Sequence, residues 1–307
     1  MTIHQDQCPL PSPHPQDEKS LVRQQVWTSL RSVALPDSRH HYDFSSFIPD
    51  FWGSDEAVTR LVDLEIYRSS KVLFITPDNC LEGLRLRALK DKKTILMTTY
   101  GIRRGFWILD PTEIPRDSYL LASTLDGMER FGRRVGLSEM AGALNPHASR
   151  SHSDGNDGNG DAQGGTVVLP LLVTGTGAIN TFGVRFGKGH GFFDLEWSIL
   201  FSLGLVDPLT SVTVAVVHDC QVLEDQELTP EEFDTVCDLV ITPTRVIVVD
   251  HHVQQDGTNP ERSRTKTQSK TMVQKPTCGI LWDKLQPGML DDIPPLQELK
   301  SMMLDKS

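Results

Sequence analysis

The segment GVRFGKGHGFFD, residues 183–194, combines several glycines with two cations and a closing carboxylate. Glycines let the backbone approach a ligand closely and turn its N–H groups toward an anion. Arg185 and Lys188 add positive charge that phosphate oxygens can accept. Asp194 is a hard oxygen ligand of the kind that Mg²⁺ takes beside phosphates. These residue types predict a site for a magnesium-bound phosphate, and a purely structural loop is the alternative.

Two further pairs of charged residues have spacings that could serve such a site. Lys19 and Arg23 lie four positions apart in an apolar pattern that predicts a helix, so their side chains share one face. A solvated basic edge is the alternative for that pair. Asp234 and Asp238 lie four apart just before a predicted strand. Either one of them completes a magnesium site with Asp194, or both belong to a solvated acidic cluster or a helix cap.

A third candidate, His218 with Asp219, follows an apolar β-branched run. At the end of a strand this pair could do acid–base work, or it could form a turn whose polar groups are all satisfied. The glycine segment itself is neither of the common nucleotide motifs. No GK[ST] follows it, and the glycine spacing of the dinucleotide-binding fingerprint is absent.

The elements that must position these residues alternate between short apolar runs and helical patterns. Such alternation predicts βαβ units, and therefore an α/β fold: a three-layer αβα sandwich with a mostly parallel sheet. The apolar density of VTVAVV indicates a strand that is covered on both faces. Ligands bind such sheets beyond the carboxyl ends of the strands. The predicted strands lie within residues 71–78, 94–100, 166–179, 211–222 and 238–250, and the predicted helices within 21–33, 56–67, 82–93 and 194–206.

Composition bounds the domain organisation. The chain has 307 residues, only 38% of them hydrophobic, which favours disordered stretches beside a real core. We expect a disordered tail over 1–17, an α/β domain over 18–252 with a disordered insertion at 145–165, and a basic, largely flexible tail over 253–307. The last tail carries its cations at Arg262, Arg264, Lys266 and Lys270. Within it, the short patch CGILWDKL at 278–285 could dock back on the domain, and ELKSMMLDK could form a terminal helix turn.

Charge and cysteine usage exclude several classes of protein. A formal net charge of −11 argues against a general binder of nucleic acid or of membrane surfaces. The five cysteines form no CxxC pair, which fits a reducing compartment and gives no zinc signature. No apolar run approaches the ~18 residues that a membrane span needs. We therefore expect a cytoplasmic protein with no membrane partner.

Taken in order, these features resemble the 5-formyltetrahydrofolate cyclo-ligase family, also called methenyltetrahydrofolate synthetase. The resemblance is closest to the branch of synthetase domain-containing proteins and spans roughly residues 18–250. It is carried by the helix with Lys19 and Arg23, by GKGHGFFD followed by LE, and by the tract from VHDCQV to TPTRVI. The family's loop ends in two tyrosines before the aspartate, where this chain has Phe192 and Phe193.

The resemblance implies a cyclo-ligase type of α/β fold and a role in one-carbon metabolism. The implied reaction closes 5-formyltetrahydrofolate to 5,10-methenyltetrahydrofolate and depends on ATP and Mg²⁺. By motif position, Asp194 and Asp234 would bind the metal, with Asp234 selected over Asp238. ATP would be held by Lys19, Arg23, Arg185, Gly187, Lys188, Gly189, His190, Gly191, Phe192 and Phe193. The sequence assigns no side chain to the chemical step.

Two other functions remain as alternatives at this point. The replaced tyrosines favour a regulator that binds nucleotide or folate without turnover. The basic tail, together with the RNA-recognition module found in animal members of the branch, favours association with RNA through residues 253–275. Binding of RNA that survived deletion of the tail would contradict the second alternative.

Overall fold

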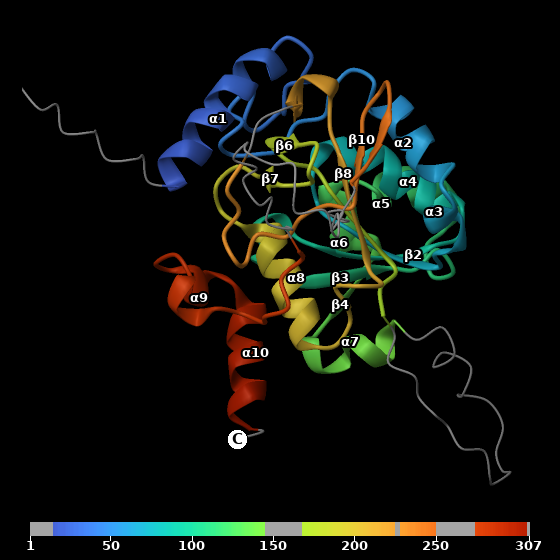
Figure 1. Ribbon diagram of the computed structural model, residues 1–307. Coiled ribbons are helices and arrows are strands. Elements are labelled where there is room, and N and C mark those ends of the chain that lie inside the picture. The colour runs from blue at the N-terminus through green and yellow to red at the C-terminus, as the bar shows by residue number, and fades with distance from the viewer. Residues whose placement is uncertain (1–14, 145–167, 225–227, 250–273, 306–307) are drawn as a thin grey trace, which may run out of the picture.

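The computed structural model describes residues 15–144, 168–224, 228–249 and 274–305 (Figure 1). Three predictions therefore lie outside the described residues, wholly or almost so. These are the disordered N-terminal tail up to residue 14, the disordered insertion at 145–165, and the flexible basic stretch up to residue 273. No helix in the described ranges is long and apolar enough to cross a membrane.

An eight-stranded sheet forms the centre of the molecule, with the strand order β11-β10-β8-β5-β1-β2-β3-β4. The five inner strands run parallel and the outer ones are antiparallel. This confirms the predicted mostly parallel sheet. The parallel strands are β1 (Val72–Ile75), β2 (Thr94–Thr98), β5 (Leu171–Thr174), β8 (Val212–Val216) and β10 (Leu239–Ile241), and the others are β3 (Phe106–Leu109), β4 (Arg133–Val135) and β11 (Val246–Val248).

Helices cover both faces of the sheet, because successive side chains of each strand point to opposite faces. In β1, Leu73 and Ile75 join one apolar core, whereas Val72 and Phe74 join the other. The first core is closed by α2 (Ser54–Val62), α3 (Glu65–Ser69), α4 (Glu82–Lys90), α5 (Tyr119–Ala122) and α6 (Leu125–Phe131). The second is closed by α7 (Leu137–Ala143), α8 (Phe192–Ser202) and α10 (Pro294–Leu304). The predicted three-layer αβα sandwich is thus confirmed.

A smaller sheet at one end of the molecule supports the N-terminal helix. It contains β6 (Ala178–Asn180), β7 (Arg185–Phe186) and β9 (Val222–Leu223), in the order β7-β6-β9. Helix α1 (Pro15–Leu30) buries Val22 and Val26 against this sheet. Each buried valine contributes roughly 1.5–3 kcal/mol. This contact fixes the helix face that carries Lys19 and Arg23.

Residues 274–305 differ from the flexible tail that the sequence predicted for this region. They contain α9 (Met289–Asp292) and α10, and Figure 1 shows this segment in red beside α8. Leu296 and Leu299 of α10 are buried in the second core. The physical reason is a short apolar stripe within the sequence PPLQELKSMML, which is enough to dock a single helix.

Candidate functional site

A cavity of about 310 Å³ opens at the carboxyl ends of parallel strands. Thr174 ends β5, Thr76 follows β1 and Tyr100 follows β2, and all three line the cavity. This is the edge at which open α/β sheets bind their ligands. The remaining walls come from α1, from the glycine segment, from the loop around Asp234 and from residues 280–289.

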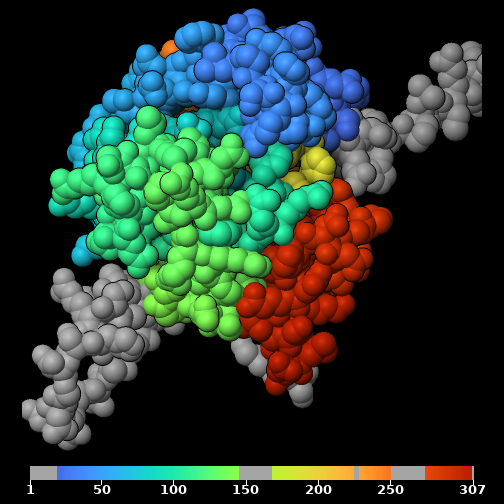
Figure 2. All heavy atoms as spheres, turned by 180° about the vertical axis from the view of Figure 1, so that it is seen from behind, coloured from blue at the N-terminus to red at the C-terminus, as the bar shows by residue number. Residues whose placement is uncertain are grey.

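The structure brings together all twelve residues that the sequence singled out for nucleotide and metal. Figure 2 shows the blue N-terminal and the red C-terminal parts of the chain on either side of a strip of yellow atoms from the middle of the chain. The residues that line the cavity include Lys19, Arg23, Arg185, Gly187, Lys188, Gly189, His190, Gly191, Phe192, Phe193, Asp194 and Asp234.

Lys19 is held by two carboxylates at one wall of the cavity. Its Nζ lies 2.6 Å from Oδ2 of Asp234 and 2.7 Å from Oε2 of Glu231. Burial by itself would lower the pKa of Lys19, but the two carboxylates raise it above its ordinary value. Asp234 is fixed further by the backbone N–H of Glu231, which donates to Oδ2 over 2.8 Å. Lys19 is therefore a charged, oriented cation.

Asp194 forms a second ion pair in the first turn of α8. Its Oδ1 lies 2.5 Å from Nη2 of Arg185 and accepts a 2.8 Å hydrogen bond from the backbone N–H of Thr235. Burial raises the pKa of Asp194, and the charge of Asp234 adds to that effect. Arg185 stacks on the ring of Phe193 and keeps a buried Nε without a hydrogen-bond partner among the described residues.

The glycine segment reaches the cavity as a loop between β7 and α8. Gly189 and Gly191 have φ of 114° and 64°, values at which a β-carbon is disfavoured. A β-carbon at Gly189 would lie 3.7 Å from the guanidinium of Arg23, so this backbone passes close to that cation. His190 stacks on Phe192 with 5.3 Å between ring centroids. This loop leads directly into the N-terminus of the eleven-residue helix α8, where free backbone N–H groups and the helix dipole favour an anion.

Lys188 crosses the cavity to its opposite wall. Its Nζ donates to the hydroxyl of Tyr100 over 2.5 Å and to the backbone carbonyl of Ser46 over 3.1 Å. Burial lowers the pKa of Lys188 to about 8, although Asp78 and Glu196 act in the opposite direction. Lys188 is therefore positively charged near neutral pH and loses this charge as the pH rises through about 8.

Sequence reasoning missed Asp78, Tyr100 and Glu196 as site residues. Asp78 accepts a 2.8 Å hydrogen bond from the backbone N–H of Gly175. Glu196 is 2% exposed and accepts a hydrogen bond from the Thr98 hydroxyl. Burial raises the pKa of Glu196 to about 8. A signal for Asp78 and Tyr100 was available, because each follows a predicted parallel strand, the place where ligands bind. No sequence signal pointed to Glu196, because its burial depends on how α8 packs in the folded protein.

Residues 280–289 were also missed as site residues, because the sequence offered docking of the patch at 278–285 but placed it in a largely flexible tail. Ile280, Leu281, Lys284, Leu285 and Met289 line the cavity. The side chain of Gln286 donates to the carbonyl of Gly189 over 3.2 Å.

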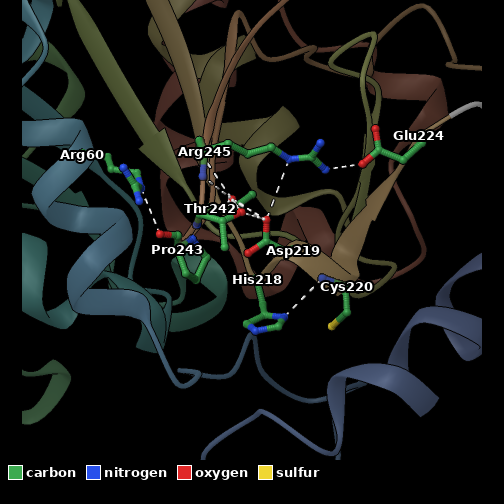
Figure 3. A network of polar contacts seen from close by, with 9 residues as sticks. Arg60, His218, Asp219, Cys220, Glu224, Thr242, Pro243 and Arg245 are labelled. Atoms are coloured by element: carbon green, nitrogen blue, oxygen red, sulfur yellow. Dashed lines mark hydrogen bonds and ion pairs between the residues drawn. The ribbon is translucent and has the colours of Figure 1, made fainter.

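Three other candidates lie away from the cavity. Asp238 forms an ion pair with Lys275. Figure 3 shows that Asp219 accepts hydrogen bonds from the β10–β11 turn, for example from Thr242 over 2.7 Å. His218 caps a short helical turn by accepting from the N–H of Cys220. The structure thus gives His218 and Asp219 the role of a satisfied turn, one of the two alternatives.

The donor set at Asp194 and Asp234 fits Mg²⁺ in its chemistry. Mg²⁺ prefers oxygen ligands and commonly takes one or two carboxylates together with substrate phosphates. Within the described ranges there is no group of three or more His, Cys, Asp or Glu side chains that could hold a metal alone. The buried Nε of Arg185, which has no hydrogen-bond partner among the described residues, could serve an oxyanion as a further donor beside these carboxylates.

Comparison with known proteins identifies the family of this chain. A family profile described as the 5-formyltetrahydrofolate cyclo-ligase family matches residues 15–243. The chain belongs to this family.

Similar proteins include the methenyltetrahydrofolate synthase domain-containing proteins of Homo sapiens, 31% identical, and of Danio rerio, 32% identical. Each match covers 92% of this chain and 61% of the relative, so the chain spans less than two thirds of the length of these relatives. Among solved structures, the NMR structure of Aquifex aeolicus 5,10-methenyltetrahydrofolate synthetase is similar, with 16% identity and a TM-score of 0.43. That match covers 81% of this chain and 99% of the other.

Proposed function

We propose that this protein converts 5-formyltetrahydrofolate to 5,10-methenyltetrahydrofolate in a reaction that depends on ATP and Mg²⁺. The observation that supports the proposal most is the convergence of Lys19, Arg23, Lys188, Asp194 and Asp234 on one cavity, in a chain of the cyclo-ligase family. Phosphorylation of the formyl oxygen would make it a leaving group, and attack by the folate N10 nitrogen would then expel phosphate. Positioning and charge stabilisation are the main tasks of a protein in such phosphoryl transfer.

The residues divide these tasks by their position in the cavity. Lys19 and Arg23 face the glycine loop from α1 and would bind the phosphates of ATP. Asp194 and Asp234 would hold Mg²⁺, which neutralises the charge that develops on the transferred phosphoryl group. For that, both carboxylates must exchange their present cation partners, Arg185 and Lys19, which then become available to phosphate oxygens.

The second half of the cavity would receive the folate. Tyr100, Asp78 and Glu196 offer hydrogen-bonding groups there, beside apolar side chains such as Ile48. This mixture of a few convergent polar groups with an apolar lining is typical of sites for heterocyclic ligands.

Turnover tests the proposal directly. Purified protein with MgATP and 5-formyltetrahydrofolate should develop the absorbance of the methenyl product. The variant Lys19→Met should lose most of this activity and bind ATP about tenfold or more weakly, because it removes a charge-assisted contact. Lys90→Met, at the exposed end of α4, is the matched control and should behave as the wild type.

A non-catalytic role in nucleotide binding is the second candidate, favoured by Phe192 and Phe193. Phe193 has no hydroxyl, and its ring is buried near Phe74. This point of the loop therefore offers a substrate no hydroxyl group. Tight MgATP binding without any product would establish this candidate and exclude the first. Product formation by the wild type that is lost in Lys19→Met would exclude the second.

A further inference from the structure

The cavity has a wall that lies outside the part of the chain matched to the family. The family match ends at residue 243, whereas residues 280–289 line the same cavity as the glycine loop. Figure 1 shows this C-terminal segment in red next to α8. The wall therefore lies outside the region that the family profile matches.

Several contacts hold the wall rigidly in place on the domain. Lys275 pairs with Asp238 at 2.6 Å, and the indole N–H of Trp197 donates to the carbonyl of Pro276 over 3.0 Å. Beyond the wall, the carboxylate of Glu298 accepts a 2.7 Å hydrogen bond from the backbone N–H of Leu137, at the start of α7. A segment anchored on both sides of residues 280–289 is a fixed surface of the site.

The wall lies on the far side of the glycine loop from the phosphate-binding cations. Gly189 separates the two regions. Its backbone passes Arg23 on one side, and on the other its carbonyl accepts a hydrogen bond from the side chain of Gln286. The side chains that the wall presents are mainly apolar, namely Ile280, Leu281, Leu285 and Met289, with the exposed cation Lys284 among them.

We propose that residues 280–289 form a subsite for the distal end of the folate, in which Lys284 binds its glutamate carboxylates and the apolar side chains pack against its aryl group. This inference rests on the proposed function. An aryl group followed by carboxylates matches an apolar surface beside one cation. More glutamate residues on the folate place more negative charge near Lys284, so they should strengthen binding.

The test measures dissociation constants for 5-formyltetrahydrofolate with one and with several glutamate residues, and for MgATP. Lys284→Glu should weaken binding of the folate with several glutamates by about five- to tenfold, because it reverses an exposed charge. The effect on the folate with one glutamate should be smaller, and MgATP affinity should stay unchanged. Lys284→Arg should retain the preference for more glutamates.

Lys90→Glu is the matched control, because it makes the same change of net charge at the exposed end of α4, outside the cavity lining. Equal effects of the two reversals would overturn the inference by showing only long-range electrostatics. A change in MgATP affinity instead of folate affinity, or no change in either, would also overturn it. If the wild type binds no folate at all, the proposed function fails, and the subsite fails with it.

Discussion

Glu196 is the clearest case in which a single residue differs from its sequence-level appearance. It follows Asp194 by two positions on α8 and would pass for a surface carboxylate, yet it is 2% exposed. Its neighbour Thr98 donates a hydrogen bond to it, and burial raises its pKa from 4.5 to about 8. At neutral pH most of this carboxyl is therefore protonated and can donate a hydrogen bond to a ligand in the cavity.

The titration of Glu196 predicts a pH-dependent stability. Between pH 4.5 and about 8 the folded state holds a proton that the unfolded state has lost. The free energy of unfolding therefore falls as pH rises through this window, by at most about 1.4 kcal/mol per pH unit. Glu196→Gln should remove this pH dependence. The free energy of unfolding of the variant should therefore increase relative to that of the wild type from pH 5 to pH 8, as measured by urea unfolding.

Glu139→Gln supplies the control for that comparison. Glu139 is an exposed residue of α7, so its replacement should shift the unfolding curves equally at every pH. A Glu196→Gln protein whose stability runs parallel to that of the wild type from pH 5 to pH 8 would show that Glu196 titrates normally.

Lys188 predicts a pH dependence of ligand binding with a defined sign. Its pKa is lowered to about 8 by burial, so its positive charge is lost as pH rises through 8. The affinity for MgATP should therefore fall between pH 7 and pH 9, by at most about tenfold per pH unit above 8. Lys188→Met should bind more weakly at pH 7, and its affinity should change little over the same range.

Isothermal titration calorimetry on wild type, Lys188→Met and Glu196→Gln separates the two groups that titrate near pH 8. If Lys188 is responsible, Glu196→Gln keeps the decline in MgATP affinity and Lys188→Met abolishes it. The opposite pattern would assign the decline to Glu196 and count against a role for Lys188 in binding phosphate.

At the scale of elements, the turn between β6 and β7 sets the direction in which the glycine loop leaves the small sheet. Gly183 in this turn has φ of 79°, and a β-carbon there would lie 2.1 Å from the carbonyl oxygen of Cys237. The carbonyl of Gly183 also accepts a 2.9 Å hydrogen bond from the N–H of Cys237. The turn thus joins the glycine loop to the segment that carries Asp234.

Gly183→Ala should therefore destabilise the protein by about 2 kcal/mol or more, because the backbone must move to relieve both the clash and the strain. Gly142→Ala is the opposite control. Gly142 lies within α7 with no atom near its missing β-carbon, so alanine there should stabilise by about 0.5–1 kcal/mol. Denaturant unfolding of both variants checks the prediction, and an equal effect of the two substitutions would contradict it.

At the scale of the whole molecule, the C-terminal segment belongs to the core of the domain. Leu296 of α10 is fully buried among residues of β-strands, α7 and α8. The cavity therefore takes its walls from both ends of the described chain, α1 and residues 280–289. We expect both to unfold together with the central sheet.

Leu296→Ala should lower the stability of the entire domain by about 2–5 kcal/mol, because it leaves a cavity in the second core. Met303→Ala on the same helix removes a side chain that is 52% exposed and should have little effect. Circular dichroism and intrinsic fluorescence should report one shared transition that shifts only in the first variant. Early unfolding of α10 alone, with the sheet unchanged, would show that this helix is an appendage.

The sequence by itself determined the central architecture and much of the side of the cavity that we propose for the nucleotide. Alternating apolar runs and helical patterns specify strands and helices locally, and the β-branched run of β8 indicates burial on both faces. The spacing of Lys19 and Arg23 puts both on one helical face, and the glycines of the loop require special backbone angles. Each of these features depends on residues close together in the chain, so a pattern can reveal it.

The tertiary structure alone decided which distant residues complete the cavity. Glu196 becomes a buried acid only because α8 packs its face against β2 and the second core. Asp238 is separated from Asp234 by its pairing with Lys275, a residue 37 positions later in the printed sequence. Residues 280–289 become a wall because α10 docks nearby. Burial and long-range contacts decide these roles, and no local spacing encodes either of them.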